Sequence, residues 1–323
     1  MKLLFFTDTH LRSTNPKNRK DDFAKTLEDK LIEITQMINQ YNIDYVIHGG
    51  DLFDRPDTSI STVTRYANII KKIEKPIYII SGNHDIFGLN PATLDRTMLG
   101  LLGNLNFLNI IRNNDKIVLE KDGLKVQLTG RPYTYDIDSD SSNYILNSLD
   151  SDCKYSINIV HGMLLDKPFV TGVPYTLIDD IITTKADITL SGHYHAGYGI
   201  IFKNDKYFVN PGSLVRITNS LKEIDRIPKV AIITLEETIS IELISLKAAK
   251  SGLEVLDRSE LEKNTFRNER LIEFKQTIDA TLNFDKVDIN DILVEVAMSE
   301  NVDDSIKEEA LKRIAMAQMK DMR

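Results

Sequence analysis

The sequence predicts an α/β protein with a strand-rich N-terminal domain, residues 1–247, and a helical C-terminal module, residues 248–323. Three observations predict this class. Short apolar runs in the first domain end in polar or glycine-rich turns, as the buried strands of a layered sheet do. An amphipathic helix separates the first two runs. The C-terminal module contains no histidine, no proline and one glycine, and its apolar residues follow a helical spacing.

The composition predicts a globular protein located in the cytoplasm, with no membrane partner. The chain has 323 residues, of which 42% are hydrophobic and 27% are charged. No apolar run reaches the length of about 18 residues that a membrane helix needs. The opening segment reaches Asp8 and His10 too soon for a signal peptide. The single cysteine, Cys153, excludes a disulfide framework and a thiolate zinc site, so we expect any metal ion to be bound by nitrogen and oxygen.

The first elements are three strands with one clear helix between the first two. Apolar residues recur every three to four positions across residues 22–39, the spacing of an amphipathic helix. Apolar runs typical of buried strands lie at residues 2–7, 45–47 and 77–80. The polar residues that follow these three runs are Asp8 and His10, then His48, Gly49, Gly50 and Asp51, then Ser81, Gly82, Asn83, His84 and Asp85.

The same pattern, an apolar strand followed by a polar turn, recurs in the second half of the domain. Strands are predicted at residues 126–129, 157–160, 188–190 and 207–209, and two more at 229–235 and 239–246 close the core. The polar residues after these runs include His161, then Ser191, Gly192, His193, Tyr194 and His195, then Asn210, Pro211, Gly212 and Ser213. Every polar cluster therefore follows the C-terminal end of a strand, which is the rim where layered α/β proteins bind ligands.

Two helices are predicted in the C-terminal module. An apolar stripe with helical spacing runs from Ile289 to Ala297, and Asp288 is placed to cap it. A second helix is predicted to begin at Ser305, which forms a capping box with Glu308.

The polar rim holds enough candidate ligands for two metal ions. Residues i and i+2 of an extended segment point the same way, so Asp8 and His10, and likewise His193 and His195, are each expected to reach one small region. Carboxylate, imidazole and amide groups suit a borderline divalent ion, manganese (Mn2+) first and otherwise iron (Fe2+) or zinc (Zn2+), rather than calcium or magnesium. The candidate metal ligands are Asp8, His10, Asp51, Asn83, His161, His193 and His195.

Five motifs in this order resemble those of the calcineurin-like metallophosphoesterases, over about residues 1–215. The motifs are Asp8-x-His10, Gly50-Asp51, Gly82-Asn83-His84-Asp85, His161-Gly162 and Gly192-His193-x-His195. The resemblance implies a four-layer α-β-β-α sandwich with a helical C-terminal extension. It also implies an enzyme in which two ions clamp a phosphate and activate a shared water.

The resemblance also implies a role for each residue. One ion would be bound by Asp8, His10, Asp51 and His195, and the other by Asp51, Asn83, His161 and His193, so that Asp51 bridges the two. His84 would stabilise the transition state or protonate the leaving oxygen. Asp85 would orient His84.

Two longer phrases are similar to those of SbcD-type (Mre-type) nucleases, the catalytic subunits of double-strand-break repair complexes, including their phage relatives. These phrases are Gly49-Gly50-Asp51-Leu52-Phe53-Asp54-Arg55-Pro56 and Asn210-Pro211-Gly212-Ser213-Leu214-Val215-Arg216. The similarity implies a DNA substrate and an SbcC-like coiled-coil ATPase partner, which helices after about residue 285 would contact. It leaves open whether the enzyme is an exonuclease or an endonuclease, and whether it forms a homodimer.

The chain departs from these nucleases in two respects. Its C-terminal module is short and helical where they carry a mixed α/β capping domain, and its net charge is −8. Both observations predict that a partner supplies much of the grip on DNA. Basic residues near the motifs are expected to contact backbone phosphates: Arg12, Lys17, Arg19, Lys20, Arg55, Arg131 and Arg216.

Two other functions remain open from the sequence. The same site would serve a phosphatase or phosphodiesterase acting on a phosphoprotein, a cyclic nucleotide or a small phosphoester, although protein phosphatases carry glutamate at the position of Asp85. A non-catalytic scaffold would be expected to lose ligands that this chain keeps. His48 matches no ligand position and is expected to be a packed histidine, and Cys153 a structural residue.

Overall fold

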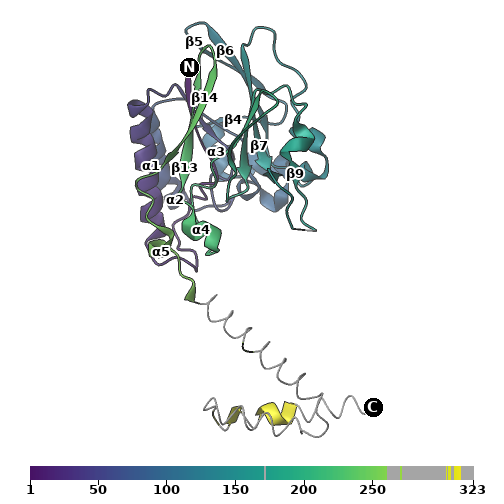
Figure 1. The fold of residues 1–323 in the computed structure, drawn as a ribbon. Coiled ribbons are helices and arrows are strands. Elements are labelled where there is room, and N and C mark those ends of the chain that lie inside the picture. The colour runs from purple at the N-terminus through teal and green to yellow at the C-terminus, as the bar shows by residue number, and fades with distance from the viewer. Residues whose placement is uncertain (171, 260–269, 271–302, 304, 307–308, 314–323) are drawn as a thin grey trace, which may run out of the picture. The chain divides into compact units, whose positions relative to one another are not determined.

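The computed structural model describes residues 1–170, 172–259, 270, 303, 305–306 and 309–313 (Figure 1). The chain divides into two units, Met1–Asp257 and Arg258–Arg323. The boundary predicted at residue 247 lies inside the first unit, because the segment after it is hydrogen-bonded to the core. The amide of Lys20 donates to the carbonyl of Val255 at 3.0 Å, and the amide of Asp257 donates to that of Asn18 at 2.9 Å.

Fourteen strands are described in the first unit, and twelve of them form two six-stranded sheets. The first sheet contains β1 (Lys2–Phe6), β2 (Tyr45–His48), β3 (Ile77–Ile79), β4 (Asn109–Ile110), β13 (Lys229–Leu235) and β14 (Ile239–Ser245). The second contains β5 (Lys116–Lys121), β6 (Leu124–Arg131), β7 (Tyr155–Gly162), β10 (Ile188–His193), β11 (Gly199–Lys203) and β12 (Lys206–Asn210). The short strands β8 (Leu164–Leu165) and β9 (Thr176–Leu177) pair separately.

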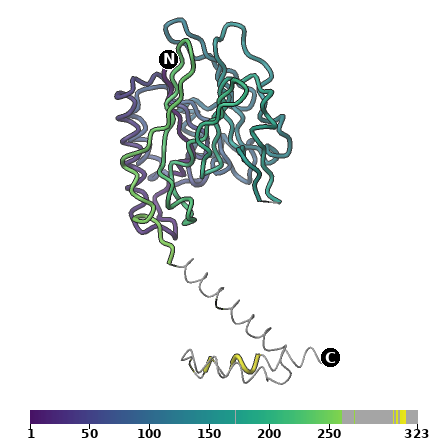
Figure 2. The backbone as a smooth tube through the Cα atoms, in the orientation of Figure 1, coloured from purple at the N-terminus to yellow at the C-terminus, as the bar shows by residue number. Residues whose placement is uncertain are grey.

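Both sheets have parallel centres. Their strand orders are β14-β13-β1-β2-β3-β4 and β11-β12-β10-β7-β6-β5. The strands from β1 to β4 are parallel, as are β6, β7, β10 and β12, whereas β13, β14, β5 and β11 join antiparallel. Figure 2 shows the consequence for the chain, since the late strand β13 lies beside the N-terminal strand β1. Parallel strands bring their C-terminal ends, and the polar turns that follow them, to one edge.

Three helices cover the outer face of the first sheet, namely α1 (Phe23–Gln40), α2 (Ile60–Ile70) and α3 (Met98–Asn104). The helix predicted at residues 22–39 is α1. Its N-cap is Asp22, whose side chain accepts a hydrogen bond from the amide of Lys25. Two short helices, α4 (Leu221–Asp225) and α5 (Gly252–Val255), lie near the end of the unit.

The predicted layered α/β fold is confirmed, and the fourth layer is made of short turns. Leu3 and Phe5 belong to the apolar core between the sheets, while Leu4 and Phe6 belong to the core beneath α1 and α2, as alternation along β1 requires. The outer face of the second sheet packs against one-turn 3-10 helices rather than α-helices. These helices are η5 (Ile137–Ser139), η6 (Ser141–Tyr144) and η7 (Ile178–Ile181). Two others, η1 (Lys71–Ile73) and η4 (Pro91–Arg96), pack into the core beneath α1 and α2. The remaining two are η2 (Asn83–Asp85) and η3 (Phe87–Leu89).

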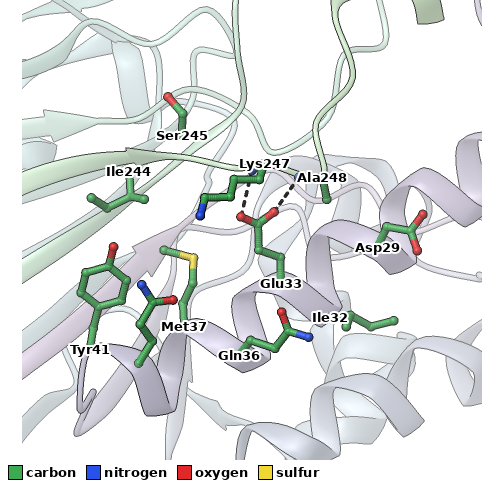
Figure 3. Close-up of a pocket in the computed structure, with 11 residues that line it drawn as sticks. Asp29, Ile32, Glu33, Gln36, Met37, Tyr41, Ile244, Ser245, Lys247 and Ala248 are labelled. Carbon is green, nitrogen blue, oxygen red and sulfur yellow. Dashed lines mark hydrogen bonds between the residues drawn. The ribbon is translucent and has the colours of Figure 1, made fainter.

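A cavity of about 430 Å³ lies between α1 and the end of β14 (Figure 3). On its wall, the carboxylate of Glu33 accepts hydrogen bonds from the amides of Lys247 and Ala248, both at 2.8 Å. Glu33 therefore fastens the chain leaving β14 to the first helix. None of the candidate metal ligands lines this cavity.

The second unit is described only in part. Residues 270, 305–306 and 309–313 are helical, and Ser305 donates a hydrogen bond to Asp303 at 2.8 Å. The predicted stripe from Ile289 to Ala297 and the capping residue Glu308 lie outside the described residues. Among the residues that are described, no helix is long and apolar enough to cross a membrane.

Candidate metal centre

The structure brings all seven candidate ligands together at one edge of the two sheets. The first sheet supplies Asp8 and His10 after β1, Asp51 after β2 and Asn83 after β3. The second sheet supplies its ligands from β7 and from the end of β10. Among the described residues, three groups of side chains have donor atoms within 4.8 Å of one another, and two of them consist of candidate ligands alone: Asp8, His10, Asp51 and His195 in the first, and Asp51, His161 and His193 in the second. The third contains His10, Asp54 and His84.

The first group converges on the nitrogen atoms of two imidazoles. Nε2 of His10 lies 3.0 Å from Nε2 of His195 and 3.7 Å from Oδ2 of Asp51. Nε2 of His195 lies 3.4 Å from Oδ1 of Asp8. The other three side chains are at most 1% exposed, but that of His195 is 33% exposed. The group is therefore buried on the side of Asp8, His10 and Asp51 and accessible to solvent on the side of His195.

The second group shares Asp51 with the first. Nε2 of His161 lies 3.4 Å from Oδ2 of Asp51 and 3.2 Å from Oδ1 of Asn83. Nδ1 of His193 lies 2.9 Å from the same oxygen of Asn83. The Asn83 amide oxygen therefore adds a third kind of donor to this group.

The donor atoms fit a divalent cation. Nδ1 of His161 lies 2.7 Å from the carbonyl oxygen of Gly49. Because a carbonyl only accepts, Nδ1 carries a proton, and Nε2 is the ring nitrogen that faces Asp51 and Asn83 and would bind a cation after losing its own proton. In the first group two imidazole nitrogens and a carboxylate oxygen face one another at short range, an arrangement that a cation between them would stabilise. The Asp/His cluster is thus suited to binding a divalent metal ion.

Opposite charges in contact set the protonation of the carboxylates. Burial alone would raise the pKa of Asp8, but the hydrogen bond and the charge of His195 outweigh it, so the pKa lies below its usual range. The pKa of Asp51 is likewise lowered, with His161 outweighing burial. Burial would lower the pKa of His161, but Asp51 raises it to about 9. Both carboxylates are therefore ionised at neutral pH, the form that binds cations.

Two histidines of the cluster are neutral. Burial is the main cause that lowers the pKa of His10 to about 3, and it also lowers that of His193 to about 4. An uncharged imidazole is the form that binds a metal ion. Nδ1 of His10 is buried and has no hydrogen-bond partner in the described part of the chain.

The backbone at the cluster is held in an unusual conformation. Asp8, His10, Asp51 and His193 have φ values of 53°, 41°, 55° and 73°, in the left-handed region that such residues rarely adopt. Hydrogen bonds hold them there: the amide of Asp8 donates to the carbonyl of Gly50 at 3.1 Å, and that of His193 to Oδ2 of Asp8 at 3.1 Å. Such strain is concentrated at functional sites, where the surrounding structure maintains it.

Comparison with known families agrees with this geometry. The sequence model of the calcineurin-like phosphoesterase family matches residues 1–197, more than half of the chain. The chain belongs to the calcineurin-like phosphoesterase family. It is therefore a metal-dependent hydrolase built on the fold described above.

Three of the relatives are double-strand break repair proteins named Mre11. The protein of Methanococcus maripaludis is 33% identical over 166 residues, covering 45% of this chain and 41% of the relative. That of Methanosarcina mazei is 26% identical over 239 residues, covering 69% and 35%. That of Encephalitozoon cuniculi is 24% identical over 288 residues, covering 77% and 48%. The chain thus spans less than half the length of each of these relatives.

The structure of this calcineurin-like phosphoesterase corrects the role expected of Asp85. Nδ1 of His84 lies 2.9 Å from the carbonyl oxygen of Asp54, to which it must donate. The buried carboxylate of Asp85 instead accepts hydrogen bonds from the amides of Gly82, Leu52 and Phe53, at 2.9, 3.3 and 3.2 Å. Burial and the charge of Asp51 raise its pKa to about 7. Asp54, through its backbone, orients His84, and Asp85 holds together the loops after β2 and β3.

His48 is a packed histidine, as expected. It is buried, and its Nδ1 accepts a hydrogen bond from the amide of Gly50 at 3.1 Å. Its Nε2 therefore carries the proton and donates to Oγ1 of Thr9 at 3.2 Å. Burial lowers the pKa of His48 to about 4, so the imidazole ring is uncharged at neutral pH. Cys153 is buried too.

Two hydroxyl groups support Asp8 in ways that the sequence did not indicate. Oγ1 of Thr7 donates to Oδ2 of Asp8 at 2.7 Å, and Oγ of Ser213 donates to its carbonyl at 2.8 Å. The amide of Ser213 also donates to the carbonyl of His195 at 2.9 Å. The turn after β12 is therefore part of the frame that positions the ligands.

The basic residues near the motifs separate into buried and accessible ones. Arg216 is fully buried and donates to the carbonyls of Arg226 and Lys250, and Arg19 is buried against Asp21 and the carbonyl of Arg216. For these two residues the expected phosphate contact is wrong, because their guanidinium groups are bound inside the protein, by backbone carbonyls and, in Arg19, also by the carboxylate of Asp21. The remaining basic residues, half-buried or exposed, are Arg12, Lys17, Lys20, Arg55 and Arg131.

Proposed function

We propose that this calcineurin-like phosphoesterase is a DNA nuclease of recombination or double-strand-break repair. In this proposal it uses two divalent ions, of which Mn2+ is the preferred one, and it acts in the cytoplasm. The observation that carries the proposal is the position of Asp51, whose carboxylate belongs to both donor groups. A bridging carboxylate between two sets of nitrogen and oxygen donors is what a two-ion site for phosphate chemistry requires.

The candidate ligands fall into two sets, one for each ion. When bound, the pair of ions would supply Lewis acidity toward the phosphate and activate water for attack at phosphorus. Asp8, His10, Asp51 and His195 would hold one ion, and Asp51, Asn83, His161 and His193 the other. The partly exposed side of His195 leaves room for a phosphodiester to approach.

His84 is the proposed general acid. Its Nδ1 donates to the carbonyl of Asp54, so Nε2 is the nitrogen left for the substrate. The ring packs edge-on against His10 with the centroids 4.6 Å apart, and its amide donates to Oδ1 of Asp51 at 2.8 Å. His84 is thereby fixed beside the cluster, where its Nε2 can give a proton to the leaving oxygen.

DNA is the proposed substrate because of the relatives and the sequence phrases. The relatives are named for the repair of DNA double-strand breaks. The Gly49–Pro56 and Asn210–Arg216 phrases, similar to those of SbcD-type nucleases, frame the cluster from both sheets. With a net charge of −8, the chain is expected to share the binding of DNA with an SbcC-like ATPase partner.

The test is degradation of end-labelled linear double-stranded DNA by the purified chain with Mn2+, beside a His84→Ala variant and bis(p-nitrophenyl) phosphate as a small ester. We expect DNA cleavage that falls by about 10²–10⁴-fold in the variant while Mn2+ binding persists. Cleavage of the small ester without DNA cleavage would favour another phosphoester as substrate. DNA cleavage equal in the variant would contradict the catalytic role of His84, and the absence of all activity would favour a scaffold.

A further inference from the structure

A polar pocket of about 200 Å³ lies at the C-terminal end of β6. Arg131 lies among its lining residues together with Asn113, Asn114, Thr134 and Ser142, and no carboxylate or aromatic residue lines it. The pocket is separate from both groups of metal ligands. Its walls thus offer cationic, amide and hydroxyl donors without an acidic residue to occupy them.

The guanidinium of Arg131 is held in place and keeps free donors. Its Nη1 donates to Oδ1 of Asn113 at 3.1 Å and to Oδ1 of Asn114 at 3.0 Å, and its Nη2 reaches the carbonyl of Ile145 at 3.5 Å. In the described part of the chain, Nε has no hydrogen-bond partner and no carboxylate pairs with Arg131. Because both asparagines accept through their oxygen, their amide NH2 groups remain available as donors.

Arg131 is therefore a half-buried cation without a counter-charge. Burial lowers its pKa somewhat, and no acidic group offsets this shift. Arginine stays charged in proteins, so the site is positive at all relevant pH values. A partly desolvated guanidinium that is pre-oriented and lacks an anion favours binding one, in particular a planar or tetrahedral oxyanion with two oxygens side by side.

The pocket lies at the same edge of the second sheet as the candidate metal ligands. Arg131 is the last residue of β6 and lies opposite Val160 of β7, the residue before His161. Neighbouring strands lie about 5 Å apart. Two residues beyond Arg131, the ring of Tyr133 lies 5.7 Å from the ring of His193, centroid to centroid. An anion in the pocket would thus lie at the end of β6, the strand next to β7, which carries the candidate metal ligand His161.

We propose that the Arg131 pocket binds a second, non-reacting phosphodiester of the strand whose scissile phosphate lies at the metal centre. This inference rests on the proposed function, since it requires a substrate with more than one phosphate. Contacts to backbone phosphates position a nucleic acid without reading its sequence. The lack of aromatic residues in the lining favours a phosphate over a base, because bases bind by stacking.

The test compares the full chain with an Arg131→Gln variant on two substrates in Mn2+, a single-stranded oligonucleotide and bis(p-nitrophenyl) phosphate. The small ester has one phosphate and does not reach the pocket while it reacts. We expect the ratio of kcat/KM for the oligonucleotide to kcat/KM for the small ester to fall about tenfold or more. Arg112→Gln is the matched control, because Arg112 is the neighbouring arginine, pairs with Asp95 and does not line the pocket. It should leave the ratio unchanged.

A second measurement is oligonucleotide binding by the His84→Ala chain, followed by fluorescence anisotropy across a salt series. A purely structural role of Arg131 would leave the salt dependence of binding unchanged. Loss of one phosphate contact reduces the slope of log K against log salt by about one. Ser142→Asp provides a second variant, since Ser142 is exposed and lines the pocket. The added carboxylate should reduce the binding of the oligonucleotide in the same way.

The two proposals fail in different ways. If the wild-type chain cleaves DNA but neither variant changes the ratio or the salt slope, the phosphate subsite is wrong and the nuclease proposal stands. An equal loss on both substrates would also overturn the subsite. If the chain does not cleave DNA but Arg131→Gln weakens oligonucleotide binding with a smaller slope, the subsite stands and the nuclease activity is wrong.

Discussion

At the scale of the residue, the position of Asp51 depends on a glycine that binds no metal. A Cβ atom at Gly82 would lie 2.1 Å from Oδ1 of Asp51 and 2.5 Å from its backbone nitrogen. These atoms are too close for real contacts, so Gly82→Ala must displace Asp51 from both donor groups. We expect Mn2+ affinity, measured by isothermal titration calorimetry, to fall by about 10–100-fold, as it does when the support of a ligand is removed.

The control for this substitution is Gly88→Ala. Gly88 has a positive φ, 56°, and a Cβ atom added there would meet nothing within 4 Å. Its alanine variant tests backbone strain without a collision, and we expect Mn2+ affinity to stay as in the wild type. Equal affinity in the Gly82→Ala variant would show that Asp51 is not fixed by this contact.

Lys30 links stability to pH. Its amine is fully buried on α1 and donates to the carbonyl of Leu214 at 2.7 Å. Burial, reinforced by the charges of Arg216 and Arg19, holds the pKa of Lys30 well below its usual value. In the unfolded chain the pKa returns to about 10.4, so unfolding takes up a proton between the two pKa values. The contribution of Lys30 to the free energy of unfolding therefore rises with pH up to about 10. It falls as the pH decreases toward the pKa of Lys30 in the folded state.

The measurement is urea unfolding of the wild type and a Lys30→Met variant in EDTA, from about pH 7 to pH 9.5. We expect the stability of the wild type relative to the variant to increase with pH, by at most about 1.4 kcal/mol per pH unit. Lys25→Met, at an exposed position of the same helix, should follow the wild-type profile. Parallel profiles for Lys30→Met and the wild type would mean that the buried amine does not take up a proton on unfolding.

At the scale of the element, the strands that carry ligands could be predicted and the helix α2 could not. Continuous apolar runs mark β1, β2 and β3 because parallel strands are buried on both faces. The sequence of α2, ISTVTRYANII, is rich in β-branched residues that favour strands. Its helical state depends on the cap at Ser59 and on the packing of Val63 and Tyr66 into the core, which is a tertiary effect.

The candidate site divides in the same way between what sequence shows and what it hides. The ligand types and their places after strands could be predicted, because side chains carry them. The partner of His84 could not, because the carbonyl of Asp54 is a backbone group that any residue has. Nor could the burial of Arg216, since its partners Arg226 and Lys250 also accept through their carbonyls.

The junction between α1 and the end of β14 offers an element-scale prediction. Glu33 accepts from two backbone amides, those of Lys247 and Ala248 (Figure 3). Glu33→Gln keeps one acceptor and turns an NH2 group toward the other amide, so we expect a loss of about 1–2 kcal/mol in the free energy of unfolding. Gln36→Ala on the same cavity wall should change it by less than about 0.5 kcal/mol. Urea denaturation measures both, and equal values would contradict the tie.

At the scale of the whole molecule, the metal centre joins the two sheets. Asp8 and Asp51 follow strands of the first sheet, and His161 and His193 belong to strands of the second. A bound ion is expected to stabilise the folded state as a whole, by about 2.7 kcal/mol at a concentration of 100 times its Kd. Mn2+ should therefore raise the Tm in differential scanning calorimetry. An equal rise in Asp51→Asn would show that the ion binds elsewhere.

The last prediction concerns the division of the chain. We propose that the region after Asp257 is an arm for an SbcC-like ATPase, and that residues 1–257 fold and hydrolyse bis(p-nitrophenyl) phosphate with Mn2+ on their own. The core clusters and all seven candidate ligands lie within this unit.

A shorter chain that ends at residue 247 should be less stable, because Arg216 and Asn18 would lose partners at Lys250 and Asp257. Calorimetry and ester hydrolysis compare the two truncations, and pull-down with a candidate ATPase compares the longer one with the full chain. Retained ATPase binding by residues 1–257 would contradict the docking arm, whereas failure of this unit to fold would contradict its independence.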